Sequence, residues 1–307
     1  MSVTNGHFRG MMSRDDSAAD GTTANSSAIC TGVKSMNYNM IVLDLDGTLT
    51  NRDKVITPRT KQSLMEAQKR GIKVVLASGR PTYGVMPLAE ELELEKYEGY
   101  ILSFNGGIIM DCRTREVIFK KELPVEANRK ILDLAEKEQV DILTYQGARI
   151  LTNNQDNPYA KIESGINHLK LKQIEDLKAY LDFPVPKFLM LDDGDYLALV
   201  EARVKAALGK NFSVYRSEPF FLEILPRGID KAQCLAQLLK LLGMEREEMI
   251  ACGDGFNDLS MIEFAGLGVA MENAVRPVRN AADYVTLSNN DDGVAHVVEK
   301  FCLNYGL

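Results

Sequence analysis

A short apolar run that ends in two carboxylates constrains this chain more than any other feature of its sequence. The run, Ile41-Val-Leu-Asp-Leu-Asp-Gly-Thr-Leu49, holds Asp44 and Asp46 two positions apart. Residues two apart in a strand point to the same side, so this spacing brings both acids to one reaction centre at the strand's carboxyl end. One aspartate there can attack phosphorus while the second protonates the departing oxygen and later takes a proton from water. The alternative is a solvated Asp-Gly turn that closes a strand.

The composition is that of an ordinary globular chain that is long enough for two domains. Of its 307 residues, 45% are hydrophobic and 26% are charged. The net charge of −7 and the absence of a dense Lys/Arg stripe argue against a nucleic-acid surface. The longest apolar candidate, residues 234–242, is interrupted by Gln237 and Lys240. We therefore expect no nucleic acid and no membrane among its partners.

The cysteines and histidines exclude several classes of site. The five cysteines are scattered without a C-x-x-C pair, which favours a reduced chain in the cytoplasm. The three histidines lie far apart, and the sequence lacks the H-E-x-x-H, G-x-S-x-G and G-x-x-x-x-G-K-[ST] motifs. Gly266-Leu-Gly268 looks like the start of a dinucleotide loop, but Met271 occupies the third glycine position. We expect no zincin, serine-hydrolase, P-loop or dinucleotide site.

The first 36 residues differ in composition from the rest of the chain. Residues 13–32 are rich in Ser, Thr, Gly, Asn and Ala and show almost no apolar periodicity, so they cannot support a packed core. No apolar segment follows a basic start, which argues against a secretory signal, and three early aspartates disfavour an organellar transit peptide. We expect residues 1–36 to form a disordered leader, with Met36 or Met40 as possible natural starts.

From Met40 onward, short apolar strands alternate with helical segments. We expect buried parallel strands at residues 40–45, 73–77, 100–104, 249–252, 267–270 and 284–287. We expect helices at residues 58–70, 82–92, 231–242, 258–265, 275–281 and 292–301. This alternation predicts a doubly wound α/β core with a parallel sheet.

The alternation changes in the middle of the chain. We expect a hairpin (108–110 with 116–121), a helix (125–139), two strands (141–145 and 148–152), a helical region after Pro158, a strand (187–191), a helix (197–208) and a closing hairpin (212–216 with 221–225). This mixture predicts an inserted α+β module of the kind that often covers a catalytic site. The predicted domains are a core at 37–111 and 226–307 and a cap at 112–225.

Three further loops carry polar groups at the ends of predicted core strands, where ligands bind in such folds. Ser78-Gly79-Arg80 offers a hydroxyl and backbone N–H groups for phosphate oxygens. Lys231 opens a predicted helix, and Gly253-Asp-Gly-Phe-Asn-Asp258 supplies two carboxylates and an amide. Each feature alone has a structural explanation, as a helix cap, a solvated lysine or a tight turn. Their occurrence together, in this order, favours one site.

The acidic residues of these loops suit a hard cation. Asp44, Asp254 and Asp258, with water and a phosphate oxygen, match the oxygen ligands that magnesium prefers. The metal would offset the repulsion between carboxylate and phosphate, and Lys231 would stabilise the transferring group.

These residues resemble the four motifs of the haloacid dehalogenase (HAD) superfamily of phosphohydrolases. The motifs are Asp44-Leu-Asp46-Gly-Thr48, then Ser78, then Lys231, then Gly253-Asp254-Gly-Phe-Asn257-Asp258. The insertion resembles the type C2B cap of the Cof-type, subfamily IIB sugar phosphatases, and Ser103-Phe-Asn105-Gly106 and Phe221-Leu-Glu-Ile-Leu-Pro226 are similar to stretches typical of them. The resemblance covers nearly everything after Met40 and implies an HAD-like Rossmannoid core with a C2B cap.

The resemblance also implies a role for each motif residue. Asp44 would be the nucleophile that forms an aspartyl-phosphate, and Asp46 would be the general acid/base. The phosphate-binding residues would be Ser78, Lys231 and Asn257, with Thr48 supporting the loop. Mg²⁺ would be bound by Asp254, the Asp44 carboxylate and the backbone carbonyl of Asp46, with Asp258 adjacent. One departure is Ala232, where the subgroup often has glycine; this affects the helix start and removes no functional group.

Substrate contacts are less well indicated by the sequence. Arg80 and Asn105, beside motif loops, are the candidates for contact with the leaving group. Within the cap, the candidates for a sugar's hydroxyls are Tyr145, Arg149, Asn157, Tyr159, His168 and Lys187, each with a surface or packing role as the alternative.

The predicted function is a Mg²⁺-dependent phosphatase that acts on small phosphate esters, foremost sugar phosphates, in the cytoplasm, as a monomer or weak homodimer. One alternative is a phosphomutase of the phosphomannomutase type, which must protect its aspartyl-phosphate from water and rebind a bisphosphate. Another is a non-hydrolytic phosphoaspartate regulatory protein, against which Asp46 and the large cap argue. A third, a catalytically idle relative, is disfavoured by the intact set of motif residues. Phosphate release without bisphosphate dependence discriminates the phosphatase from the mutase.

Overall fold

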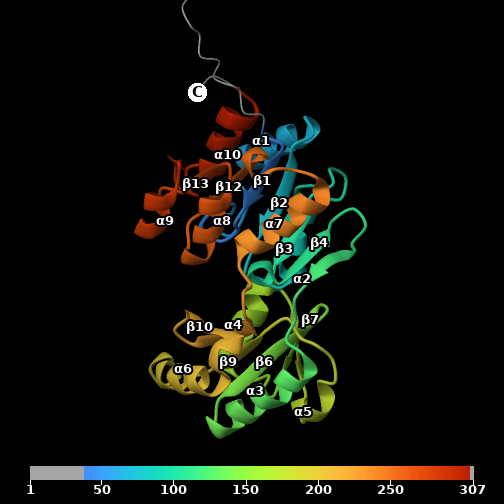
Figure 1. Cartoon of the computed structure of the whole chain (residues 1–307), viewed down its shortest axis with the longest axis vertical. Coiled ribbons are helices and arrows are strands. Elements are labelled where there is room, and N and C mark those ends of the chain that lie inside the picture. Colours follow the sequence, from blue (N-terminus) through green and yellow to red (C-terminus); the bar gives the residue numbers. More distant parts are fainter. Residues whose placement is uncertain (1–37, 305–307) are drawn as a thin grey trace, which may run out of the picture. The chain divides into compact units, whose positions relative to one another are not determined.

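The computed structural model describes residues 38–304, and its largest element is an eight-stranded sheet (Figure 1). The spatial order is β14-β13-β12-β1-β2-β3-β4-β5, in which the first six strands are parallel and the last two antiparallel. The strands are β1 (Met40–Leu43), β2 (Lys73–Ala77), β3 (Tyr100–Ser103), β4 (Ile108–Asp111), β5 (Val117–Lys120), β12 (Met249–Gly253), β13 (Leu267–Ala270) and β14 (Tyr284–Val285). All six predicted core strands are confirmed. The predicted leader lies outside the described residues.

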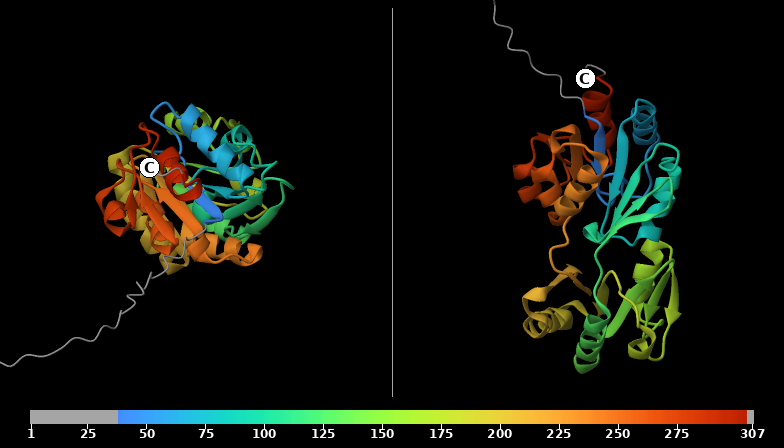
Figure 2. Two further views of the ribbon diagram at one scale, coloured as in Figure 1. Left: turned by 90° about the horizontal axis from the view of Figure 1, so that it is seen from above. Right: turned by 45° about the vertical axis from the view of Figure 1, so that its right-hand side comes forward.

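Helices lie on both sides of this sheet (Figure 2). They are α1 (Pro58–Lys69), α2 (Thr82–Glu91), α7 (Lys231–Leu242), α8 (Leu259–Phe264), α9 (Arg276–Ala281) and α10 (Gly293–Val297). Helix α1 packs against α10, while α8 contacts both α7 and α9. The predicted doubly wound α/β core is confirmed.

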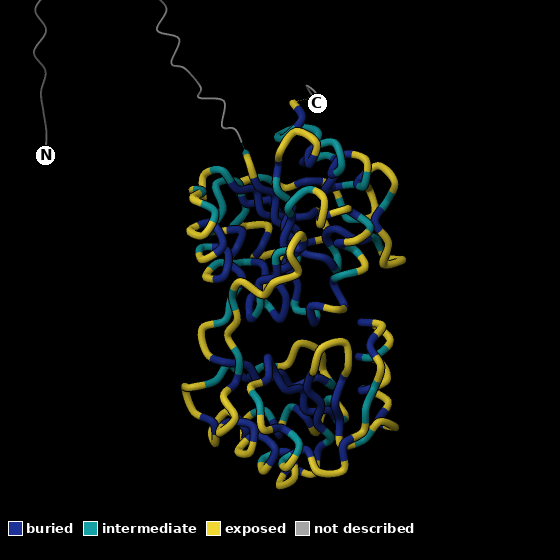
Figure 3. The backbone as a smooth tube through the Cα atoms, turned by 90° about the vertical axis from the view of Figure 1, so that its right-hand side faces the viewer, coloured by how far each residue is buried: buried dark blue, intermediate teal, exposed yellow. Residues whose placement is uncertain are grey.

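Burial explains why the apolar runs form central strands. Every residue of β1 is fully buried, as expected for a strand covered by helices on both faces. Buried stretches run through the centre of the fold in Figure 3, and exposed stretches lie toward its outside. Helix α7 begins where the Asp230 side chain accepts a hydrogen bond from the backbone N–H of Gln233 at 2.9 Å. This cap fixes Lys231 in the first turn of α7.

The strand order determines where the site lies. Strand β1 pairs in parallel with β2 on one side and with β12 on the other. The carboxyl ends of the three strands therefore meet at one edge, and Asp44, Ser78 and Asp254 follow them directly. This is the edge at which doubly wound sheets bind ligands.

The inserted segment forms a second, six-stranded sheet in the order β10-β11-β9-β6-β7-β8. Its strands are β6 (Asp141–Gln146), β7 (Arg149–Thr152), β8 (Lys170–Gln173), β9 (Phe188–Leu191), β10 (Phe212–Glu218) and β11 (Phe221–Pro226). Its helices are α3 (Val125–Lys137), α4 (Pro158–Asn167), α5 (Leu177–Tyr180) and α6 (Gly194–Leu208). The predicted α+β character of the insertion is confirmed.

Two elements of the insertion were not predicted. Strand β8 lies at the edge of the sheet and has no buried residue. Its sequence, Lys-Leu-Lys-Gln, contains a single apolar residue, so no apolar pattern indicated a strand there. Helix α5 is a single turn that begins where Asp176 accepts a hydrogen bond from Ala179 N at 3.0 Å.

Strand β5 pairs with β4 and so belongs to the eight-stranded sheet. The cap boundary predicted at residue 112 therefore falls inside the β4–β5 hairpin, and the second sheet begins only with β6. The division into domains stays a prediction. No helix among residues 38–304 combines the length and apolar character needed to cross a membrane.

Candidate active site

Lys231 is the centre of the acidic cluster at the carboxyl edge of the sheet. Its fully buried Nζ donates to Asp44 Oδ1 at 2.6 Å, to Asp258 Oδ1 at 2.5 Å and to the carbonyl oxygen of Ala77 at 2.8 Å. Burial works to lower the pKa of Lys231, but the carboxylates of Asp258 and Asp44 outweigh it and raise that pKa above its ordinary value. Lys231 therefore stays charged and orients two aspartates from different loops.

Asp254 is held in place by the first motif loop. Thr48 Oγ1 donates to Asp254 Oδ1 at 2.9 Å. Gly47 lies against the same carboxylate in a left-handed conformation (φ +88°), and a Cβ at this position would overlap Asp254. Only glycine satisfies both conditions without strain. The Gly47-Thr48 pair thus has a structural role in bringing the β1 and β12 loops together.

Asp258 supports the loop that follows β12. Its Oδ2 accepts hydrogen bonds from the backbone N–H groups of Asp254 at 3.0 Å and Gly255 at 2.9 Å. Its Oδ1 accepts from Lys231. Both carboxylate oxygens of this fully buried side chain are therefore engaged within the protein.

The cluster has the donor chemistry of a divalent-cation site. Carboxylate oxygens of Asp44, Asp254 and Asp258 lie within 4.8 Å of one another. Burial raises the pKa of Asp254 to about 6, although the hydrogen bond from Thr48 opposes the rise. Burial, followed by repulsion from Asp258, also raises the pKa of Asp44, while Lys231 works against this. Asp44 and Asp258 are buried and Asp254 is half-buried, and this concentration of carboxylate oxygens fits Mg²⁺.

Asp46 has a different electrostatic environment. Arg80 donates to both of its carboxylate oxygens, and Lys54 Nζ donates to Oδ1 at 2.7 Å. Burial favours the neutral acid, but the two cations outweigh it and hold the pKa of Asp46 below its ordinary value. Lys54 was not among the predicted site residues, because it lies in a loop between the first motif and α1 with no recognised signal.

Three more of the predicted residues, Ser78, Asn105 and Asn257, lie in the loops after β2, β3 and β12. Ser78 is buried, and its Oγ accepts from the backbone N–H of Arg80 at 3.1 Å. Asn257 Nδ2 donates to Asn105 Oδ1 at 3.2 Å, and Asn105 Nδ2 donates to the hydroxyl of Tyr215 in the insertion at 3.1 Å. Eight of the sequence-predicted core residues line one cavity of about 550 Å³: Asp44, Asp46, Ser78, Arg80, Asn105, Asp254, Asn257 and Asp258. The other two, Thr48 and Lys231, lie behind them and do not line it.

Of the six predicted cap candidates, only Lys187 lines this cavity. Tyr145 is buried and donates to Glu163 at 2.6 Å, Asn157 caps α4, and Tyr159 stacks on Phe220. Arg149 and His168 line a separate surface cavity. The cap residues that line the main cavity and that sequence reasoning missed are Glu163, Ile166, Asn167, Leu189, Tyr215, Arg216, Ser217, Glu218, Phe221 and Glu223.

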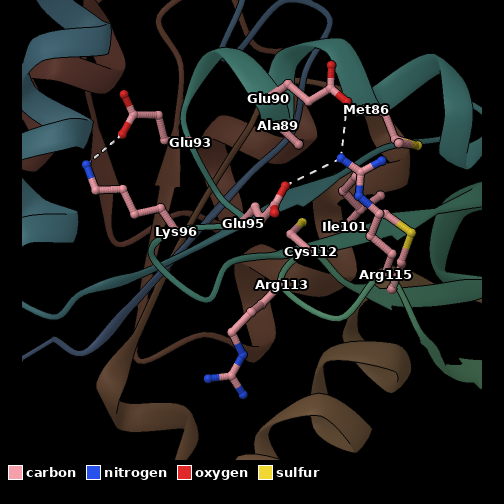
Figure 4. A pocket seen from close by; sticks show the side chains of 11 residues that line it. Met86, Ala89, Glu90, Glu93, Glu95, Lys96, Ile101, Cys112, Arg113 and Arg115 are labelled. Carbon is pink, nitrogen blue, oxygen red and sulfur yellow. Dashed lines mark hydrogen bonds and ion pairs between the residues drawn. The ribbon is translucent and has the colours of Figure 1, made fainter.

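A different cavity, of about 480 Å³, lies beside α2 and contains none of the predicted site residues (Figure 4). Its lining combines apolar side chains such as Met86 and Ile101 with charged residues that pair with one another. Arg115 Nη2 is 3.4 Å from Glu95 Oε2, and Lys96 Nζ is 3.0 Å from Glu93 Oε2. The residues of the four sequence motifs gather at the 550 Å³ cavity instead.

Comparison with known proteins places nearly all of the described chain in one family. The family model of the haloacid dehalogenase-like hydrolases matches residues 41–298. A haloacid dehalogenase-like hydrolase from Bacteroides thetaiotaomicron is 48% identical, with a TM-score of 0.84 over 86% of this chain and 99% of its own. The 5-amino-6-(5-phospho-D-ribitylamino)uracil phosphatase YcsE of Bacillus subtilis is 30% identical over 87% of this chain and 97% of its own.

A further solved structure, described as the HAD subclass IIB sugar phosphatase BT4131, is 25% identical, with a TM-score of 0.71 over 86% of this chain and 98% of its own. The family match, the fold of the solved structures and the motif residues all indicate the same family. The chain therefore belongs to the haloacid dehalogenase-like hydrolase family, as its motifs predicted, and it is an HAD-type phosphatase.

Proposed function

We propose that this phosphatase depends on Mg²⁺ and hydrolyses small phosphorylated metabolites, foremost sugar phosphates, through an aspartyl-phosphate on Asp44. The observation that carries the proposal is the position of Asp44, whose carboxylate is oriented by buried Lys231 and lines the 550 Å³ cavity. An oriented carboxylate beside a fixed cation is suited to attack a phosphate ester, because the cation stabilises charge on the transferring group.

The two proton transfers fall to Asp46. In the first step a carboxylate oxygen of Asp44 bonds to phosphorus, the bond to the leaving oxygen breaks, and that oxygen takes a proton from Asp46. In the second step Asp46 accepts a proton from water, the water oxygen attacks phosphorus, and the bond to Asp44 breaks. The contacts from Arg80 and Lys54 favour the carboxylate form of Asp46, which is the form that the second step requires.

Mg²⁺ would be held by the carboxylates of Asp44 and Asp254 and by the backbone carbonyl of Asp46. When bound, it supplies charge that offsets the repulsion between these carboxylates and the phosphate oxygens. Asp258 was predicted as a further ligand. Because both of its oxygens accept hydrogen bonds from protein groups, we propose that it orients Lys231 and the Asp254 loop instead.

The cavity supports a small, hydroxyl-bearing leaving group. Its volume of about 550 Å³ lies within the range of small-molecule sites. The names of two relatives refer to leaving groups that carry several hydroxyls, a sugar in one case and a ribityl chain in the other. The four described cysteines are free thiols, which supports the cytoplasm as the place of action, and we expect a monomer or weak homodimer.

The testing experiment measures phosphate release from sugar phosphates, ribityl and nucleotide phosphates and p-nitrophenyl phosphate, with Mg²⁺ or with EDTA. We expect Mg²⁺-dependent release in the parent and none in Asp44→Asn. Asp156→Asn, at an exposed aspartate of the cap, is the matched control and should behave as the parent. Borohydride reduction during turnover should convert the aspartyl-phosphate to homoserine at position 44, detected by mass spectrometry.

Other outcomes would favour the alternatives. Activity that requires an added bisphosphate would indicate the mutase, and a long-lived phosphorylated form without phosphate release would indicate the regulatory protein. Substantial phosphatase activity in Asp44→Asn would refute the nucleophile assignment.

A further inference from the structure

A second buried lysine–carboxylate pair lies in the cap wall of the cavity. Lys187 directly precedes β9, and Glu223 lies on β11. Their side chains are 4% and 6% exposed, and both line the cavity that contains Asp44. Buried charges outside the catalytic cluster need a reason, because burial of an ion pair costs several kcal/mol per ion before any compensating contact.

The contacts of this pair are long. Lys187 Nζ lies 3.3 Å from Glu223 Oε1 and donates to the Gly79 carbonyl at 3.4 Å. Glu223 Oε2 accepts from the Tyr215 hydroxyl at 3.4 Å. Charge-assisted hydrogen bonds are ordinarily about 2.7–2.9 Å, and the buried Lys231–Asp44 pair measures 2.6 Å. The Lys187 ammonium and the Glu223 carboxylate therefore retain hydrogen-bonding capacity that the described protein groups use only weakly.

A hydrogen-bonded chain connects this pair to the catalytic loops. It runs from Asn257 to Asn105 at 3.2 Å, from Asn105 to Tyr215 at 3.1 Å, and from Tyr215 to Glu223 at 3.4 Å. Asn257 belongs to the loop that carries Asp254 and Asp258. The pair is thus held at a place in the cavity that is defined relative to the phosphate loops.

The charge of the cavity wall indicates the kind of leaving group. Each described cation that lines the cavity is paired with a carboxylate: Lys54 and Arg80 with Asp46, Lys187 with Glu223, and Arg216 with Glu201. Among the described residues, no cation that lines the cavity is without a carboxylate partner and so available to bind an anionic group on the leaving group. A hydroxyl, in contrast, both accepts and donates, so it can meet an ammonium and a carboxylate together.

We propose that Lys187 and Glu223 form the leaving-group subsite and select a neutral polyol, with the ammonium donating to its hydroxyls and the carboxylate accepting from them. Leaving groups that carry a carboxylate or a second phosphate are rejected by Glu223, which repels them and neutralises Lys187. This inference rests on the proposed phosphatase function and specifies its substrate class.

Two compounds with the same carbon skeleton test the proposal. D-Glucitol 6-phosphate ends in a neutral CH₂OH group, and 6-phosphogluconate ends in a carboxylate at the same carbon. Each is measured as a competitor of p-nitrophenyl phosphate hydrolysis, so the inhibition constant is obtained whether or not the compound is turned over. We expect glucitol 6-phosphate to bind the parent about tenfold more tightly or better.

The two substitutions should act on different compounds. Glu223→Gln removes the repelling charge and leaves Lys187 unpaired, so the preference should shift toward 6-phosphogluconate by about tenfold. Lys187→Met should weaken the binding of glucitol 6-phosphate without improving the binding of 6-phosphogluconate. The double variant Lys187→Met/Glu223→Gln buries no unpaired charge, so it should not show the improved binding of 6-phosphogluconate that we expect of Glu223→Gln. Glu136→Gln, in an exposed cap pair with Lys178, should keep the parent's preference.

The outcomes separate this proposal from the one on which it rests. If the parent shows no Mg²⁺-dependent hydrolysis of p-nitrophenyl phosphate, the proposed function fails. The subsite proposal is overturned if a parent active on that ester prefers 6-phosphogluconate or binds neither compound. It is also overturned if Glu223→Gln leaves the preference unchanged, or if the gain persists in the double variant.

Discussion

Arg80 clamps Asp46 by two parallel hydrogen bonds, from Nε to Oδ2 at 2.7 Å and from Nη2 to Oδ1 at 2.6 Å. Arg80 follows β2 and Asp46 follows β1, so the contact joins two neighbouring loops at the carboxyl edge of the sheet. A bidentate contact fixes the plane of a carboxylate as well as its charge. The orientation of Asp46 therefore depends on the shape of the guanidinium group.

Arg80→Lys should lower kcat/KM for a sugar phosphate about tenfold, because an ammonium keeps the charge but cannot form the bidentate contact. Steady-state kinetics would check this, with Arg113→Lys as the control. Arg113 forms an exposed ion pair with Glu98, and its replacement should leave kcat/KM unchanged. A parent-like Arg80→Lys variant would show that the charge alone suffices.

Asp46→Asn should slow hydrolysis in proportion to the leaving group's need for a proton. General acid catalysis contributes about 10²–10⁴-fold. We expect a loss in that range for a sugar phosphate and a much smaller loss for p-nitrophenyl phosphate, whose phenolate leaves with little proton assistance. The measurement is kcat for both esters in the parent and the variant. Equal losses for the two esters would count against the acid role of Asp46.

The cluster of aspartates around Lys231 could be predicted from the sequence because local patterns determine where its members lie. Asp44, Ser78 and Asp254 each follow an apolar strand, and parallel strands bring such positions to one edge. Lys231 begins a helix capped by Asp230, so its place also follows from local sequence. The order of the strands then brings Asp44 close to Asp258, which is 214 positions further along the chain.

The cap wall could not be predicted in the same way. Tyr215 and Glu223 lie on β10 and β11, and the contact of Tyr215 with Asn105 depends on how the second sheet packs near the core loops. Candidates selected by residue type alone, such as Arg149 and His168, lie at another cavity. The sequence offered one indirect signal for Glu223, since it lies in a stretch typical of the Cof-type subgroup.

Lys231→Met should destabilise the fold as well as impair catalysis. The ammonium is fully buried and is the cation that contacts both Asp44 and Asp258. Removing one partner from a buried ionic cluster leaves uncompensated charge and costs about 3–5 kcal/mol. Urea unfolding would measure this loss in the free energy of unfolding. Lys96→Met, which breaks an exposed pair with Glu93, is the control. A loss below about 1 kcal/mol in Lys231→Met would contradict the structural role.

Mg²⁺ should stabilise the protein in the absence of substrate, because the neighbouring carboxylates of Asp44 and Asp254 repel each other when no cation is bound. A ligand present at about 100 times its Kd stabilises the native state by about 2.7 kcal/mol, which for a chain of this size corresponds to a Tm increase of about 5 °C. Differential scanning fluorimetry with Mg²⁺ or EDTA would measure it without any dependence on activity.

Asp254→Asn should abolish this Mg²⁺-induced shift. The amide oxygen can still accept the hydrogen bond from Thr48, so the loop should keep its conformation, but the side chain loses the charge that attracts the cation. Without Mg²⁺, the variant's Tm should equal or exceed the parent's, since one source of repulsion is removed. The control variant Asp156→Asn should show the same Mg²⁺-induced increase in Tm as the parent. A full Mg²⁺ shift in Asp254→Asn would mean that the stabilising cation binds elsewhere, and no shift in the parent would remove the support for a metal at this cluster.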